Sequence, residues 1–219
     1  MKEDRPVSSP VCYRDLPEGD AQEDLEVARW RRAERERLLE ARKALAVQAR
    51  QDWGQALMAH LRDGLPGWLG DPRGRVISGY WPIKGEADLR PWLAELDAAG
   101  AIVALPVVEE RAAPLVFRRW RPGMAMERGH WSIPVPPTDS DRVVPELALA
   151  PLVGWDGAGY RLGYGGGYFD RTLAALTPRP FVVGVGLQAA RLPGIFPRWH
   201  DIPMSAIVTE AGIQVPPAA

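Results

Sequence analysis

A glycine-rich stretch from Arg161 to Arg171 contains the residue types in this chain that most clearly predict chemistry. It reads RLGYGGGYFDR, with four glycines between two arginines and an aspartate, Asp170, near its end. Glycine lets the backbone approach a ligand closely, and arginine can bind phosphate through two parallel hydrogen bonds. Two common phosphate patterns do not fit: Tyr168 stands where the dinucleotide fingerprint needs its last glycine, and no Gly-Lys-Ser/Thr of a P-loop follows.

The surroundings of this stretch nevertheless favour an anion site. The apolar run ELALAPLVG, which ends at Gly154, predicts a strand buried on both faces, and a helix is expected to begin near Gly167. Loop N–H groups and the positive end of that helix would then point at one place. Asp170 could hold a magnesium ion through one carboxylate and waters. The alternative is a tight surface turn in which Arg161 pairs with Asp170.

A second group of candidate anion ligands lies in the segment 21–50. This segment contains neither Gly nor Pro and is rich in Ala, Leu, Glu and Arg, which predicts one long helix. A second helical piece, QDWGQALMAHLR, is expected to end at Gly64. At about 100° per residue, Arg31, Arg35 and Arg42 share a face with leucines, so their guanidinium groups are predicted to point inward at an anion. The alternative is an exposed helix with ordinary ion pairs to its glutamates.

Length and composition exclude several classes of protein. The 219 residues, 46% hydrophobic and 25% charged, are expected to form a single α/β domain over 21–219, with 1–20 as a disordered or loosely attached arm. A net charge of −1 argues against a nucleic-acid binder. No apolar run approaches the roughly 20 residues that span a bilayer, and the first residues lack the apolar centre of a signal peptide. We therefore expect a cytoplasmic protein without a membrane partner.

Beyond the helices, short β-branched runs alternate with helical segments. RVISGYW and AIVALPVV flank DLRPWLAELDAAG, in which Asp88 is expected to cap a helix and Gly100 to end it. APLVFRRW alternates like an edge or hairpin strand, and FVVGVGLQ and SAIVTEAGI are expected to be the last strands. This alternation predicts an α/β sandwich with a mostly parallel sheet.

The glycine-rich stretch resembles the signature of the 5-formyltetrahydrofolate cyclo-ligase family. YWPIKGEADLRPWL and HDIPMSAIVTEAGI resemble an earlier and a later segment of the same family, and with the arginine helix the resemblance extends from about Arg31 to Ile213. It implies a Rossmann-like, three-layer sandwich of the NagB/RpiA/CoA-transferase type with a long N-terminal helix. It also implies ATP-dependent conversion of 5-formyltetrahydrofolate to 5,10-methenyltetrahydrofolate, with release of ADP and phosphate, by a monomer or weak homodimer.

The resemblance also implies roles for individual residues. Arg31 stands where the family usually has lysine, and Gly166 where some members have lysine. The expected substrate-binding residues are Tyr80, Glu86 and Trp131, with Glu86 accepting hydrogen bonds from the amino-pyrimidinone edge of a pterin. The residues expected to be catalytic are Arg161, Tyr168 and Asp170, and Asp170 is the expected magnesium ligand. The residues expected to bind ATP are Arg31, Arg35, Arg161, Gly163, Tyr164, Gly165, Gly166, Gly167, Tyr168, Asp170 and Arg171.

Four alternatives stay open at this point. Glu86 could, like Asp88, do no more than cap a helix, and His200, beside Asp201, is interpreted as a structural histidine more than a catalytic base. The chain could also be a homologue that kept the fold and the nucleotide pocket as a binding or regulatory protein. A sugar-phosphate isomerase on a related sheet would need a paired acidic base beside the loop, where only Asp170 stands.

Overall fold

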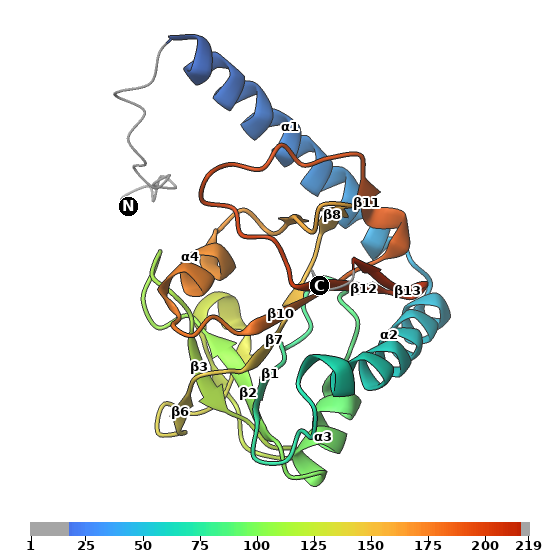
Figure 1. Ribbon diagram of the computed structural model, residues 1–219, viewed down its shortest axis with the longest axis vertical. Helices are drawn as coiled ribbons and strands as arrows, with labels where there is room; N and C mark the ends of the chain where they lie inside the picture. Colours follow the sequence, from blue (N-terminus) through green and yellow to red (C-terminus); the bar gives the residue numbers. More distant parts are fainter. Residues whose placement is uncertain (1–17, 216–219) are drawn as a thin grey trace.

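An eight-stranded sheet forms the centre of the protein (Figure 1). The structure is a computed structural model and describes residues 18–215. Strands β12, β10, β7, β1 and β2 run parallel to one another, while β13, β3 and β6 each pair antiparallel with a neighbour. In order across the sheet the strands are β13 (Gly212–Val215), β12 (Ala206–Thr209), β10 (Phe181–Val185), β7 (Leu147–Pro151), β1 (Val76–Ser78), β2 (Ile102–Val107), β3 (Val116–Arg119) and β6 (Arg142–Val143).

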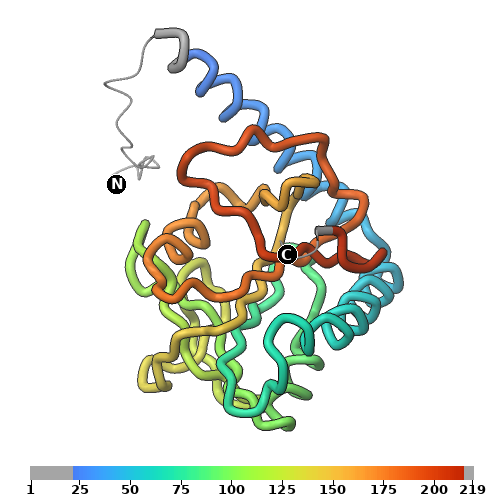
Figure 2. The backbone as a smooth tube through the Cα atoms, viewed as in Figure 1, coloured from blue at the N-terminus to red at the C-terminus, as the bar shows by residue number. Residues whose placement is uncertain are grey.

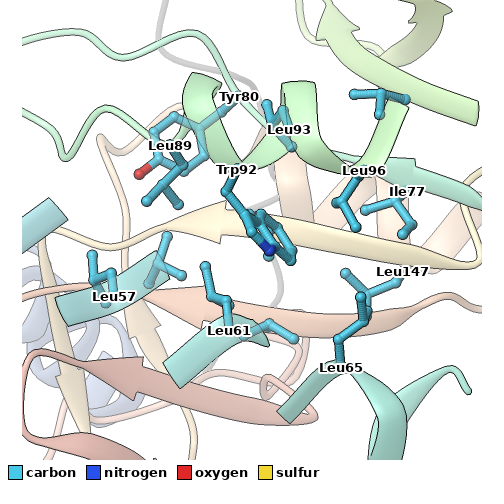
Figure 3. Packing of buried hydrophobic residues seen from close by; sticks show 14 of the residues in the cluster. Leu57, Leu61, Leu65, Ile77, Tyr80, Leu89, Trp92, Leu93, Leu96 and Leu147 are labelled. Atoms are coloured by element: carbon cyan, nitrogen blue, oxygen red, sulfur yellow. The ribbon is translucent and has the colours of Figure 1, made fainter. Parts of the chain in front are cut away.

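Helices cover both faces of this sheet, which confirms the predicted three-layer sandwich. One face carries α2 (Val47–Trp68) and α3 (Arg90–Ala98). Figure 3 shows leucines of these two helices closing around Trp92 and the sheet residues Ile77 and Leu147. The other face carries α1 (Glu18–Lys43) and α4 (Tyr168–Ala175). Side chains of β7 alternate between the two layers, because successive residues of a strand point to opposite faces.

The predicted single helix over 21–50 is wrong, because the chain breaks between Lys43 and Val47. Ala46 is extended, with φ −57° and ψ 152°, so the second helix starts in a new direction. Helix α2 then continues through Gly64 to Trp68, beyond the predicted end, with Pro66 inside its last turn. The break carries no Gly or Pro signal; it arises because α1 and α2 pack on different layers.

The strand expected to end at Gly154 is also shorter than predicted. Strand β7 ends at Pro151, and the chain leaves the main sheet to form a hairpin, β8 (Gly154–Asp156) and β9 (Arg161–Leu162), which pairs with β11 (Arg191–Leu192) in a second sheet. The glycine-rich loop therefore follows β9. The remaining short elements are β4 (Glu127–Arg128), η1 (His130–Ser132), β5 (Pro134–Val135) and η2 (Gln188–Ala190).

The two ends of the described chain complete the architecture. Helix α1 begins at Glu18, so the predicted arm is shorter by three residues, and its remainder lies outside the described residues. The backbone between β11 and β12 passes beside α1 (Figure 2), where Arg31 donates to the carbonyl oxygen of Ile195. Within 18–215, no helix is both long enough and apolar enough to span a membrane.

Candidate functional site

The glycine-rich loop joins β9 to α4, and two of its glycines adopt a backbone conformation that other residues avoid. Gly165 has φ +90° and Gly167 has φ +62°. Gly167 immediately precedes α4, and no side chain caps that helix. The N–H groups of its first turn have no partner within the helix, and the helix dipole makes this end positive. The loop therefore has local features that suit an anion, and anion binding itself stays a prediction.

Two arginines lie against the loop from opposite elements. Arg35 of α1 donates through Nε to the carbonyl oxygen of Gly163 at 2.8 Å. Among the hydrogen bonds of the described residues, none involves its two terminal nitrogens, so both are available for a phosphate. Burial lowers the pKa of Arg35, and the charge of Arg31 adds to that effect. Arg171 of α4 donates to the carbonyl oxygen of Gly166.

Arg161 and Asp170 form an ion pair, which is the alternative considered from the sequence, but the pair is buried. The distance from Nη2 of Arg161 to Oδ2 of Asp170 is 2.9 Å, and the side chains are 6% and 18% exposed. The backbone of Ile202 holds both partners, since its N–H donates to Oδ1 of Asp170 and its carbonyl accepts from Nη1 of Arg161. Burial lowers the pKa of Arg161, and the opposite effect of the charge of Asp170 is smaller.

The groups around Asp170 determine whether it could bind a magnesium ion. Among residues 18–215, no three His, Cys, Asp or Glu side chains gather into a metal site. Each carboxylate oxygen of Asp170 makes one hydrogen bond and keeps a further lone pair. Because magnesium in nucleotide sites takes one or two carboxylates together with phosphate oxygens and waters, Asp170 fits as a single protein ligand.

Arg31 is held by protein partners, in contrast to Arg35. Its Nη2 contacts Oδ2 of Asp201 at 2.6 Å and the carbonyl of Phe196 at 2.7 Å, and its Nε contacts the carbonyl of Ile195 at 2.9 Å. Only 9% of the residue is exposed. In this arrangement Arg31 fixes the segment 195–201 beside the loop, and its expected phosphate contact stays a prediction.

Glu86 lies deep in the site, 5% exposed, where the sequence predicted only a position near a strand end. Its Oε1 accepts from the hydroxyl of Tyr164 at 2.5 Å, and its Oε2 accepts from the N–H of Ile83 at 2.9 Å. Burial raises the pKa of Glu86, and the hydrogen bonds from Tyr164 and Ile83 oppose that rise. A buried carboxylate thus lies next to the glycine-rich loop.

The other predicted substrate residues differ in their placement. Tyr80 is 4% exposed, packs in the core (Figure 3) and donates to the carbonyl of Ala87, and its expected contact with the substrate stays a prediction. Trp131 is 65% exposed on η1, and its ring meets Tyr168 edge to face at 5.7 Å. The loop and the Trp131 segment, 37 residues apart in the chain, therefore border the same space. Asp88 accepts from the N–H of Arg90, but the N-cap of α3 is Leu89 and no side chain caps that helix, so the predicted capping role of Asp88 is wrong by one residue.

Two residues of the site were given no role from the sequence. Arg42 was placed on the arginine face but not assigned a contact; it donates from Nη2 to the hydroxyl of Tyr164 at 2.5 Å. Asp201 was considered only as the neighbour of His200, yet it pairs with Arg31. The inward face of the helix was the signal for Arg42, whereas only the fold could reveal the partner of Asp201.

Known proteins match this chain over most of the described residues. The sequence model described as the 5-formyltetrahydrofolate cyclo-ligase family matches residues 27–210. A protein named 5-formyltetrahydrofolate cyclo-ligase from Mycolicibacterium smegmatis is 31% identical over 172 residues, which cover 74% of this chain and 89% of the relative. A protein of the same name from Escherichia coli is 28% identical over 178 residues, covering 78% of this chain and 96% of the relative.

Solved structures are similar over most of this chain. The solution structure of Aquifex aeolicus 5,10-methenyltetrahydrofolate synthetase has a TM-score of 0.70 at 30% identity, and the match covers 84% of this chain and 92% of that one. A 5,10-methenyltetrahydrofolate synthetase from Mycoplasma pneumoniae has a TM-score of 0.65 at 20% identity, covering 82% and 98%. The second likeness supports the fold alone.

Proposed function

Because the chain belongs to the 5-formyltetrahydrofolate cyclo-ligase family, a family of ligases, we propose that it converts 5-formyltetrahydrofolate to 5,10-methenyltetrahydrofolate and uses ATP, which is released as ADP and phosphate. The observation that carries the proposal is the contact between the glycine-rich loop and Glu86 through Tyr164. The loop that we expect to bind phosphate and a buried carboxylate meet at one place, as the two substrates of such a reaction require.

The chemistry follows from the poor leaving ability of a formamide oxygen. That oxygen attacks the γ-phosphorus of ATP, ADP leaves, and an imidate phosphate forms. The neighbouring folate nitrogen then attacks the formyl carbon, its proton is lost, and the phosphate leaves with the former formyl oxygen. Such a transfer depends on positioning and on neutralising charge more than on a protein nucleophile.

The residues of this chain would divide that work between them. Arg35 and the N–H groups at the start of α4 would bind the phosphates, and Arg161 would neutralise charge from beneath the loop. Glu86 would accept hydrogen bonds from the amino-pyrimidinone edge of the folate, while Trp131 and Tyr168 would border the reacting centre. A magnesium ion brought by the nucleotide would add charge neutralisation at the phosphates, with Asp170 as its protein ligand.

A second candidate is a family member that binds nucleotide or folate without this turnover. The observation in its favour is that Arg31, where the family usually has lysine, is bound to Asp201 and two carbonyl groups and is not free to meet a nucleotide. Both candidates predict binding, so only turnover separates them.

The test is an absorbance assay for methenyltetrahydrofolate, run with and without ATP and magnesium. We expect product only when both are present, and we expect Arg35→Gln to lower kcat/KM at least tenfold, the equivalent of about 1.4 kcal/mol. Arg32→Gln is the matched control, because Arg32 is exposed on the same helix and its one ion pair within residues 18–215 is with Glu36. Binding of both substrates without product would support the second candidate, and product without ATP would refute the proposed reaction.

A further inference from the structure

Tyr164 projects from the glycine-rich loop toward the residues expected to bind the folate. Its hydroxyl lies 2.5 Å from Oε1 of Glu86 and 2.5 Å from Nη2 of Arg42. The ammonium group of Lys84 lies 5.0 Å from the centre of its ring. A single side chain of the loop therefore contacts the buried carboxylate, helix α1 and the segment before Glu86.

The direction of these hydrogen bonds is fixed by Arg42. A guanidinium group can only donate, so the oxygen of Tyr164 accepts from Arg42 and its own hydrogen points to Glu86. Arg42 is itself fixed, because it is 3% exposed and donates to the carbonyl oxygens of Leu152 at 3.1 Å and Lys84 at 3.2 Å. The chain of contacts from Arg42 through Tyr164 to Glu86 thus has one orientation.

This chain of contacts favours the ionised form of Glu86. Burial raises the pKa of that carboxyl, and the hydrogen bonds from Tyr164 and Ile83 and the charges of Arg42 and Lys84 lower it. The hydroxyl of Tyr80, which also lies near Glu86, donates its hydrogen to the carbonyl of Ala87 and not to the carboxylate.

Each oxygen of Glu86 accepts one hydrogen bond from the protein and keeps a further lone pair. The unused lone pairs can accept two N–H donors from a ligand, provided that the carboxyl is ionised.

We infer that Tyr164 and Arg42 are positioning residues, which hold Glu86 oriented for the folate and join it to the loop that binds the nucleotide. This inference rests on the proposed function. Neither residue needs to touch a reacting atom, since Tyr164 acts on the folate through Glu86 and Arg42 acts through Tyr164.

The test measures the Kd of 5-formyltetrahydrofolate by tryptophan fluorescence at a series of pH values, with thermal unfolding of the same samples. Tyr164→Phe removes only the hydroxyl, so we expect the Kd to rise about tenfold, in line with the loss of a hydrogen bond to a charged group. Binding needs the ionised carboxylate, so affinity falls as pH drops through the pKa of Glu86. Without the hydrogen bond from Tyr164 that pKa is higher, and the pH at which affinity is half lost should move upward. Arg42→Lys, which keeps the charge and loses the fork, should show both effects.

Tyr160→Phe is the matched control, because Asp156 binds the backbone N–H of Tyr160 and not its hydroxyl. We expect its Kd and pH profile to equal those of the parent. An unchanged or tighter Kd in Tyr164→Phe, or an unmoved pH profile, would overturn the inference while the parent still binds folate and Glu86→Gln still weakens that binding. If the parent does not bind folate, or Glu86→Gln binds as well as the parent, the assignment of Glu86 in the proposed function fails instead.

Discussion

Asp170→Asn should destabilise the protein strongly, because it removes the charge that faces a buried arginine. The side chain of Arg161 is 6% exposed and its Nη2 lies 2.9 Å from Oδ2 of Asp170. At an effective dielectric constant of about 20, two unit charges at that distance attract by about 6 kcal/mol. Much of this attraction offsets the cost of removing both charges from water. The net contribution of the intact pair to stability is therefore small, whereas the loss of one partner leaves the other charge buried and is costly.

The single substitution leaves Arg161 buried without its counter-charge. Removing one partner of a buried pair typically costs about 3 to 5 kcal/mol. Asparagine can still accept the N–H of Ile202, which holds Oδ1 of the aspartate, so we expect a loss near the lower end, about 3 kcal/mol of unfolding free energy. The double variant Arg161→Met, Asp170→Asn buries no lone charge and should lose less than Asp170→Asn alone.

Urea unfolding at neutral pH, followed by fluorescence and circular dichroism, measures these losses in a double-mutant cycle. Glu36→Gln is the control, because the pair of Glu36 with Arg32 is largely exposed and its loss should change stability by no more than about 0.5 kcal/mol. A loss below about 1 kcal/mol in Asp170→Asn, together with additive effects in the cycle, would refute the claim that this pair is desolvated.

Three further predictions concern the loop and two carboxylates. Gly165→Ala and Gly167→Ala should each cost about 1 kcal/mol of stability because of their positive φ and should weaken ATP binding at least tenfold by calorimetry; unchanged ATP affinity would contradict the phosphate-binding role of the loop. For Asp201, burial is outweighed by hydrogen bonds from Arg31 and the backbone, which lower its pKa below 3.8. Its stabilisation is therefore present above that value and is lost as pH falls through the lowered pKa, so Asp201→Asn should flatten the acid limb of the stability curve. Burial raises the pKa of Glu86 above 4.5, so its contribution to stability declines as pH rises through that window; thermal unfolding should therefore depend less on pH there in Glu86→Gln than in the parent, although the amide keeps only one of the two hydrogen bonds that the carboxylate accepts.

The features that the sequence predicted well are those set by local pattern. The run LALAP is apolar throughout, as a strand between two parallel neighbours must be, and β7 has β10 and β1 on its two sides. The glycines of the loop similarly reflect a local need, since Gly165 and Gly167 have positive φ. In both cases the physical cause acts within a few residues, so the residue types report it directly.

The features that the sequence could not supply depend on partners distant in the chain. Arg31 and Asp201 are 170 residues apart, and the aspartate decides whether the guanidinium is held by protein or left for a ligand. The break after Lys43 has the same origin, because α1 and α2 bury their apolar faces in different layers although no residue between them opposes helix formation. Tertiary packing overrides local preference here.

The arginine face of α1 shows what the fold adds to a correct local prediction. Arg31, Arg35 and Arg42 point inward, as their spacing with leucines indicated, and together they contact three segments. Arg31 fixes the segment that carries Asp201, and Arg35 holds the carbonyl of Gly163 in the glycine-rich loop. Arg42 supports Tyr164 in the same loop and donates to the carbonyl of Lys84 in the segment before Glu86. Because α1 is a rigid element, these contacts fix three loops relative to one another. Rigid placement of separate groups is what a reaction between two bound substrates needs, so the helix contributes to the site mainly by setting the distances between residues that it does not itself carry.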